Sequence, residues 1–184
     1  MAYKIEQRVG IAAPVDDVYD IIADIEAWPT WSPIHKAATG KLSFGAPIHL
    51  EENYEGLGVW EIDGNLADWA PYSHIHVFVP KPFYAGKLMR YFEFEALSEV
   101  GSTFTIGALF DGYLSQREGK AYGKYLRKGF IAFTEALKEK AEKAYADSPD
   151  KRRSPREIKV PEKPQLAPKR MGVPIPHFFG RKKR

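Results

Sequence analysis

Two histidines in the segment YSHIHVF, His74 and His76, are spaced in a way that could support metal chemistry. On a β-strand, residues two apart share one face, as metal ligands can. The sequence shows no third ligand beside them, because the chain has no Cys and no H-E-x-x-H pattern. Ile75, Val77 and Val79 make the better apolar face of this segment, so we expect both histidines to point to solvent. We predict no metal site.

Arg90 is the second candidate for chemistry, because it alternates with Leu88, Phe92 and Phe94 on the apolar side of a predicted strand. A buried guanidinium needs an anionic or carbonyl partner, since an unpaired buried charge costs several kcal/mol. Two alternatives follow. Arg90 forms an internal ion pair with a carboxylate such as Glu52, or it contacts the acidic end of a ligand.

The sequence marks no residue as an activated catalytic group. General acid–base catalysis needs a titratable side chain within hydrogen-bonding reach of the reacting atom. No nucleophile elbow or phosphate-binding loop occurs, and the absence of Cys excludes a disulfide scaffold and a cysteine nucleophile. Arg90 and Tyr113 remain as weak catalytic candidates, and we predict no cofactor.

Hydrophobic periodicity predicts the elements that position these residues. Residues 3–11 alternate as a strand, and apolar residues at helical spacing predict a helix that starts at Pro14 and stops at Trp28-Pro29. Regular Gly and Pro turn signals indicate a meandering antiparallel sheet. The six further strands are expected at residues 36–44, 47–54, 57–68, 72–80, 88–98 and 102–112.

Residues 115–146 predict a long amphipathic helix that covers the apolar face of this sheet. Its bulky apolar residues step by three or four; they are Tyr122, Leu126, Phe130, Phe133 and Leu137. We expect about 28–30 helical residues, hence about 40–45 Å at 1.5 Å per residue.

The segment D-x-x-x-W-P-x-W-x-P at residues 24–33, which follows A-P-x-x-x-V at residues 13–18, carries a family resemblance. It resembles the polyketide cyclase/dehydrase-like branch of the START/birch-pollen-allergen superfamily, often called SRPBCC. The Gly-Ser-Thr turn at residues 101–103 and the aromatic long helix are also similar to that family. The resemblance covers about residues 3–145. It implies an α+β helix-grip fold, in which a seven-stranded antiparallel sheet wraps around a long C-terminal helix and two short helices close one end of a cavity.

In such a fold the interior is expected to be aromatic and mostly dry, which suits a hydrophobic or aromatic ligand. Trp28 and Trp31 then either plug the rim of the cavity or fill the core. A solid core without a usable hole is the alternative to a cavity. The predicted lining residues are Trp28, Trp31, Tyr54, Trp60, Arg90, Phe92, Phe94, Phe104, Phe110, Tyr122, Leu126 and Phe130.

The charge of the chain is divided unevenly. The net charge of +3 combines a value of +8 for residues 147–184 with −5 for residues 1–146, and the first of these segments holds seven of the 14 prolines. We therefore expect a globular domain over residues 1–146 and an extended basic, proline-rich tail over residues 147–184.

A short apolar cluster followed by basic residues ends this tail and is typical of a docking peptide. The predicted partner-binding residues are Val173, Ile175, Phe178, Phe179, Arg181, Lys182, Lys183 and Arg184. A protein partner or a sister subunit is the first expectation. An anionic membrane surface, nucleic acid and a merely solvated tail are the alternatives.

These observations favour a binding protein over an enzyme. The first residues, MAYKIEQRVG, lack the apolar run of a signal peptide, so we expect a cytoplasmic location. We expect a non-catalytic carrier, sensor or accessory protein that binds a hydrophobic or aromatic small molecule, or a lipid. A cyclase/aromatase-like enzyme is the alternative that the resemblance implies. An accessory subunit of a larger complex, tethered by its tail, is the third.

Overall fold

A computed structural model describes residues 2–147 of the chain, and the predictions for residues 148–184 lie outside this range. The described chain folds as a seven-stranded sheet with a long helix and two short helical segments. In chain order the elements are β1 (Tyr3–Ile11), α1 (Val15–Ala23), the 3₁₀ helix η1 (Ile25–Thr30), β2 (His35–Gly40), β3 (Pro47–Tyr54), β4 (Gly58–Ala70), β5 (His74–Val79), β6 (Lys87–Ser98), β7 (Gly101–Asp111) and α2 (Tyr113–Asp147).

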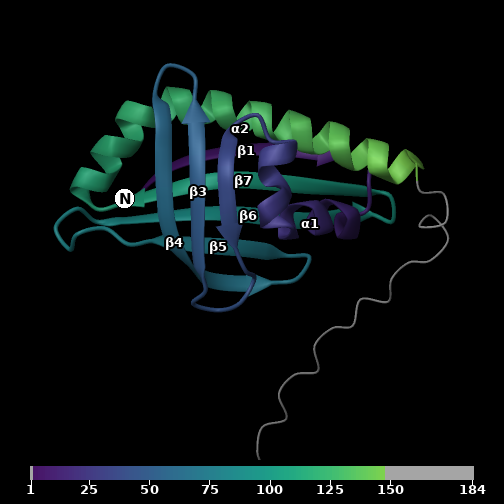
Figure 1. The fold of residues 1–184 in the computed structure, drawn as a ribbon, viewed down its shortest axis with the longest axis horizontal. Helices are drawn as coiled ribbons and strands as arrows, with labels where there is room; N and C mark the ends of the chain where they lie inside the picture. Colours follow the sequence, from purple (N-terminus) through teal and green to yellow (C-terminus); the bar gives the residue numbers. More distant parts are fainter. Residues whose placement is uncertain (1, 148–184) are drawn as a thin grey trace, which may run out of the picture.

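The sheet is antiparallel throughout, with the strand order β1-β7-β6-β5-β4-β3-β2. Strands β2 to β7 form consecutive hairpins, and β1 pairs with the last strand in the chain. Figure 1 shows the sheet curling beneath α2, so that β3 and β4 cross the direction of β1, β7 and β6. This arrangement confirms the predicted helix-grip fold.

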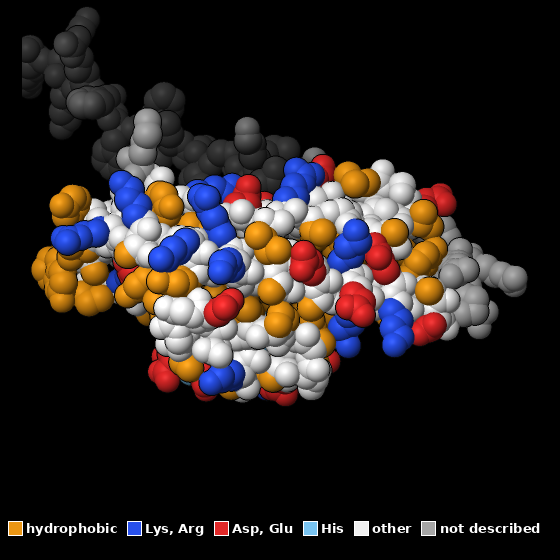
Figure 2. All heavy atoms as spheres, turned by 90° about the horizontal axis from the view of Figure 1, so that it is seen from above, with side chains coloured by type: hydrophobic (Ala, Val, Ile, Leu, Met, Phe, Trp, Pro, Cys, Tyr) orange, Lys and Arg blue, Asp and Glu red, His pale blue; other side chains and the backbone are white. Residues whose placement is uncertain are grey.

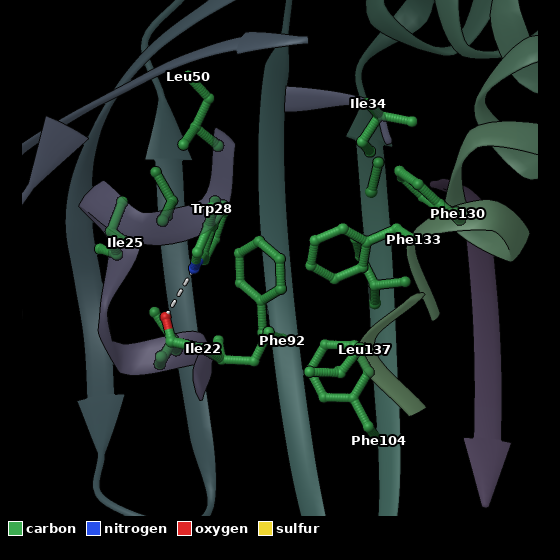
Figure 3. Close-up of a cluster of buried hydrophobic side chains, with 14 of the residues drawn as sticks. Ile22, Ile25, Trp28, Ile34, Leu50, Phe92, Phe104, Phe130, Phe133 and Leu137 are labelled. Atoms are coloured by element: carbon green, nitrogen blue, oxygen red, sulfur yellow. Dashed lines mark hydrogen bonds between the residues drawn. The ribbon is translucent and has the colours of Figure 1, made fainter. Parts of the chain in front are cut away.

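Strand alternation decides which side chains enter the interior. In β3 the residues Ile48, Leu50, Glu52 and Tyr54 are buried, while the residues between them are more exposed. The aromatic rings of β6 and β7 meet those of α2 in the core, where Phe92, Phe104 and Phe133 lie together (Figure 3). Burial of these rings is the main driving force that holds the helix to the sheet.

Periodicity predicted one helix that ends at Trp28-Pro29, whereas the family resemblance implied two short helices, and the structure has two. Helix α1 stops at Ala23, because Asp24 leaves helical geometry with φ −82° and ψ 73°. Trp28 and Pro29 belong to the separate 3₁₀ helix η1, whose tighter winding accommodates the proline. The expected helix was therefore two elements, and the Trp corner belongs to the second.

Helix α2 is also longer than predicted, with 35 residues from Tyr113 to Asp147. Part of its buried face consists of glycine. A Cβ at Gly129 would lie 2.3 Å from Tyr54 Cε1, and one at Gly119 would lie 2.7 Å from the Phe110 ring. Glycine at these positions lets the helix backbone approach aromatic rings of the sheet closely. The predicted buried face of the helix contained bulky apolar residues only and did not include these glycines.

The surface seen in Figure 2 is of mixed charge, with Lys and Arg side chains interspersed among Asp and Glu, while hydrophobic side chains gather at one end. Exposed aromatic residues near the start of α2 include Phe83, Tyr84 and Tyr113. Among residues 2–147, no helix is both long enough and apolar enough to cross a membrane.

Candidate ligand-binding site

Trp28 fills the core at one end of the interior. Its indole Nε1 donates a hydrogen bond to the Ile22 carbonyl oxygen at 3.0 Å, which ties η1 back to α1 (Figure 3). Its ring lies 4.8 Å from the His35 ring, 5.3 Å from Phe92 and 5.9 Å from Phe133, measured between centroids. Of the two roles considered for Trp28, the structure supports packing in the core.

Arg90 lies in the interior and forms the internal ion pair that the sequence raised as one alternative. Arg90 Nη1 donates to Glu52 Oε2 at 2.7 Å, and Nη2 donates to Oε1 at 3.0 Å. Both side chains are 0% exposed. The guanidinium also lies 4.9 Å from the centroid of the Phe130 ring, a cation–π contact. The bidentate geometry neutralises the buried charge within the protein.

Three further polar groups complete this buried cluster. Tyr54 Oη donates to Glu52 Oε2 at 2.8 Å, and His35 Nε2 lies 3.2 Å from Glu52 Oε1. Ser32 Oγ is 2.7 Å from His35 Nδ1 and lies 3.4 Å from the backbone N–H groups of Ile34 and His35. Ser32 therefore holds the turn before β2 in place. The sequence gave no indication of His35, because a β-bulge between His35 and Ala37 turns it inward.

The electrostatics of the cluster keep its charges fixed. Burial alone would raise the pKa of Glu52, but Arg90 and His35 hold that pKa down at about 2. Burial would lower the pKa of Arg90, and Glu52 outweighs this and raises it. The pKa of Tyr54 lies well above its usual value because of burial and the adjacent Glu52 charge. At neutral pH the pair is ionised and Tyr54 keeps its proton, so none of the three is poised for proton transfer.

A hollow of about 250 Å³ lies between α1, η1 and α2. It is lined by Asp17, Asp20, Ile21, Asp24, Ala27, Trp31, Lys140 and Ala144. The Trp31 ring borders the core as well, at 5.1 Å from the Phe133 centroid. Trp31 Nε1 is enclosed and has no hydrogen-bond partner among residues 2–147. The hollow thus combines apolar side chains, among them Trp31, with an acidic rim.

The other predicted lining residues divide into two groups. Phe92, Phe94, Phe104, Phe110, Leu126 and Phe130 are buried in the core, as is Tyr54. Trp60 and Tyr122 are only partly buried and lie 6.2 Å apart between ring centroids, with Trp60 stacked on Phe110 at 6.5 Å. Tyr113 is 80% exposed, at the first residue of α2, and so does not contact the buried cluster. The predicted partner-binding residues 173–184 lie outside the described range.

The outer face of the sheet carries the two histidines. Ile75, Val77 and Val79 are buried, and His74 and His76 face outward, as expected. The structure brings Asp68 of β4 close to both histidines, although the sequence had shown no third ligand.

The curled sheet gripping a long C-terminal helix defines a helix-grip protein of the START-like class. A family model described as "Polyketide cyclase / dehydrase and lipid transport" matches residues 2–142, and the chain belongs to this family. The resemblance seen in the sequence is thereby confirmed. Among curated proteins, no sequence matches this chain.

Solved structures share the fold at low sequence identity. A START superfamily protein from Mycobacterium smegmatis has a TM-score of 0.61 and 17% identity, covering 77% of this chain and 98% of its own. The Zhui aromatase/cyclase from Streptomyces sp. R1128 has a TM-score of 0.61 and 16% identity, covering 78% and 95%. Norcoclaurine synthase from Thalictrum flavum, in complex with a transition-state analogue, has a TM-score of 0.59 and 12% identity, covering 78% and 96%.

Proposed function

We propose that this protein binds a small aromatic or hydrophobic molecule without transforming it, acting as a carrier, sensor or accessory protein. The observation that carries the proposal is Trp31, whose side chain lines a hollow beside an aromatic core and whose enclosed indole Nε1 has no hydrogen-bond partner among residues 2–147. A buried donor without a partner costs about 1–3 kcal/mol, and a ligand oxygen would relieve that cost. The family description, which includes lipid transport, supports a hydrophobic ligand.

The size and charge of the hollow limit the ligand. An apolar cavity of about 150 Å³ admits benzene, so the volume of about 250 Å³ suits a compound of one or two rings or one end of a longer chain. The carboxylates of Asp17, Asp20 and Asp24 line the hollow, against one Lys140. This rim disfavours an anionic ligand and favours a neutral one with a carbonyl or hydroxyl oxygen.

We propose binding without catalysis because the charged groups of the buried cluster are already paired with each other. Arg90 is the one charged residue among the predicted lining positions, and Glu52 already occupies it in a bidentate pair. A guanidinium committed in this way has little capacity left to stabilise charge that develops on a substrate. Two of the structural neighbours are an aromatase/cyclase and a synthase, so an enzyme remains the competing function.

We further propose that the basic tail, residues 147–184, docks the domain to a protein partner. The sequence pattern of Val173, Ile175, Phe178 and Phe179 before RKKR supports this role. Salt-resistant association that is lost on changing Phe178 and Phe179 to Ala would support protein docking. Association that weakens strongly with salt would favour lipid headgroups or nucleic acid instead.

The binding proposal is tested with two fluorescent naphthalenes that share the ring system and the dimethylamino group. Prodan carries a ketone and no charge, and 2-dimethylaminonaphthalene lacks the ketone. We expect one equivalent of prodan to bind, and Trp31→Phe to weaken it about fivefold, the value of one hydrogen bond of about 1 kcal/mol. The probe without the ketone should bind both forms equally.

Two variants locate the binding site, and a product assay separates binding from catalysis. Ala144→Trp fills the hollow and should abolish prodan binding, whereas Ile131→Trp, on an exposed face of the same helix, should not. Absence of saturable binding, or equal binding to both Trp variants, would refute the site. Turnover of a linear poly-β-ketone to a cyclised product would instead establish the enzyme.

A further inference from the structure

The outer face of the sheet holds a second group of chemically capable side chains, away from the ligand hollow. His74 and His76 belong to β5, and Asp68 lies on the adjacent strand β4. One ligand atom from each of the three residues lies within 4.8 Å of those of the other two. His74 Nε2 is 3.1 Å from Asp68 Oδ2, and the two imidazole centroids are 4.7 Å apart.

A β-bulge creates this group. In β4, Leu66 pairs with the inward-facing Val77, and strict alternation would send Asp68 to the same inner face. The register shifts between Leu66 and Asp68, so Asp68 is opposite the outward-facing His76. Bulges of this kind re-aim a side chain and are common next to functional sites. Sequence alternation alone therefore misplaces Asp68.

The imidazole nitrogens are available for a ligand. The Nε2 atoms of His74 and His76 are both enclosed; they face carboxylates, with His74 Nε2 3.1 Å from Asp68 Oδ2 and His76 Nε2 3.8 Å from Glu93 Oε1. Ser73 Oγ lies 3.1 Å from His74 Nδ1, so the tautomer that donates from Nδ1 leaves a lone pair on Nε2.

We propose that Asp68, His74 and His76 form a binding site for a divalent transition-metal ion such as Zn²⁺. In a tetrahedral site with bonds of about 2.0–2.2 Å, neighbouring ligand atoms are about 3.3–3.5 Å apart. His74 Nε2 and Asp68 Oδ2 are already 3.1 Å apart, and one ligand atom from each of the three residues lies within 4.8 Å of the others. A donor set of two imidazoles and one carboxylate also binds transition-metal ions in preference to Mg²⁺ and Ca²⁺.

The surroundings of the three residues give an ion access to the site and offer a fourth ligand for its coordination shell. A hollow of about 290 Å³ opens beside His74 and His76. Glu93 of β6 lines the same hollow and is half-exposed, with Oε1 3.8 Å from His76 Nε2. Glu93 or a water molecule can therefore take the fourth position. Arg8, the cation at this hollow, is paired with Glu95 and does not oppose the ion.

Titration of the untagged full chain with Co²⁺ tests the proposal, because tetrahedral Co²⁺ gives an intense visible absorption that octahedral Co²⁺ lacks. We expect one equivalent to bind with a tetrahedral spectrum and Zn²⁺ to displace it. Asp68→Asn, His74→Ala and His76→Ala should each weaken Co²⁺ binding at least tenfold. Glu93→Gln should change the spectrum if its carboxylate is the fourth ligand, and leave it unchanged if water is.

The chain supplies a matched control. His49 and Asp63 form another exposed His–Asp pair on this sheet, with 2.7 Å between Nδ1 and Oδ1. His49→Ala should leave Co²⁺ binding unchanged, and so should His177→Ala in the tail. If His76→Ala lowers the urea midpoint of unfolding, His76→Gln, which retains side-chain bulk, replaces it. Equal Co²⁺ affinity of the parent and the His76 variant, or a purely octahedral spectrum, would overturn the proposal.

Discussion

The two faces of the same sheet differ in the burial and pairing of their polar side chains. On the inner face, Arg90 and Glu52 are fully buried, and Tyr54 adds a further hydrogen bond to their pair. On the outer face, His74 and His76 are partly exposed, and their Nε2 atoms face the exposed carboxylates of Asp68 at 3.1 Å and Glu93 at 3.8 Å. Charged groups that are buried and paired with one another contribute stability and specificity, whereas groups that are partly exposed are within reach of a further ligand.

The largest effect is expected from breaking the inner pair. Arg90→Met leaves Glu52 buried without its cation, and removing one partner of a buried pair costs about 3–5 kcal/mol. Urea unfolding followed by circular dichroism measures this loss in the free energy of unfolding. The double variant Glu52→Gln/Arg90→Met removes both charges and should recover more than half of it. Equal stability of Arg90→Met and the parent would show that the pair is not buried as described.

The same pair should make stability depend on pH. The pKa of Glu52 lies at about 2 in the fold, below its ordinary value of 4.5, so its contribution is complete above pH 4.5 and is lost as pH falls toward 2. The shift corresponds to about 3 kcal/mol, since one pKa unit is about 1.4 kcal/mol. Unfolding free energies measured from pH 6 to pH 2 should fall more steeply for the parent than for Glu52→Gln. Parallel curves would contradict the assignment.

A smaller effect is expected where helix α2 meets the inner face. In Gly129→Ala the new Cβ would lie 2.3 Å from the buried ring of Tyr54, which its bond to Glu52 holds in place. Overpacking costs about 1–3 kcal/mol, and the better helix propensity of Ala returns about 1 kcal/mol. We expect a net loss of about 1 kcal/mol.

Gly123→Ala is the matched control for this change. Its Cβ would contact the Tyr3 hydroxyl at 3.0 Å, at the end of a partly buried side chain that can move. We expect no loss of stability, and a gain of up to about 1 kcal/mol from helix propensity. Thermal unfolding of the two variants side by side measures the difference. A Gly129 variant as stable as the Gly123 variant would contradict the close approach of α2 to Tyr54.

The smallest effect is expected on the outer face. Arg8 pairs there with Glu95, and both side chains are more than half exposed. Exposed pairs contribute about 0.2–1 kcal/mol, because water and salt screen them. A double-mutant cycle with Arg8→Ala and Glu95→Ala should give a coupling energy in that range that shrinks in high salt. A coupling as large as that of the inner pair would remove the contrast between the two faces.

The fold was predictable because its signals are periodic and local. Alternation placed Arg90 on the inner face, and helical spacing placed Phe130 and Phe133 against the sheet. Features that break periodicity were not predictable. The bulges at His35 and Asp68 moved one side chain into the core and one out of it.

Of the residues that line the candidate site, only Trp31 was among the predicted lining residues. An aromatic interior that contains Arg90 could be inferred from strand alternation, and its buried ion pair with Glu52 was one of two alternatives. The hollow at Trp31 could not be inferred, because it forms where η1 and α1 meet the far end of α2. Lining residues such as Ala27 and Ala144 have no sequence pattern that indicates a binding site. The resemblance implied a second short helix, but periodicity did not show that it begins at Ile25 and so carries Trp28 and positions Trp31.

The central claim is tested most directly at the indole N–H of Trp31. The chain has four Trp residues, hence four indole ¹H–¹⁵N resonances, and Trp31→Phe identifies the one that belongs to Trp31. Trp28 and Trp69 already donate to Ile22 and Tyr19, so their resonances serve as internal references. Saturation with prodan should shift the Trp31 resonance downfield, and 2-dimethylaminonaphthalene should not. A Trp31 resonance that stays in place while prodan binds, or an absence of prodan binding, would contradict the account.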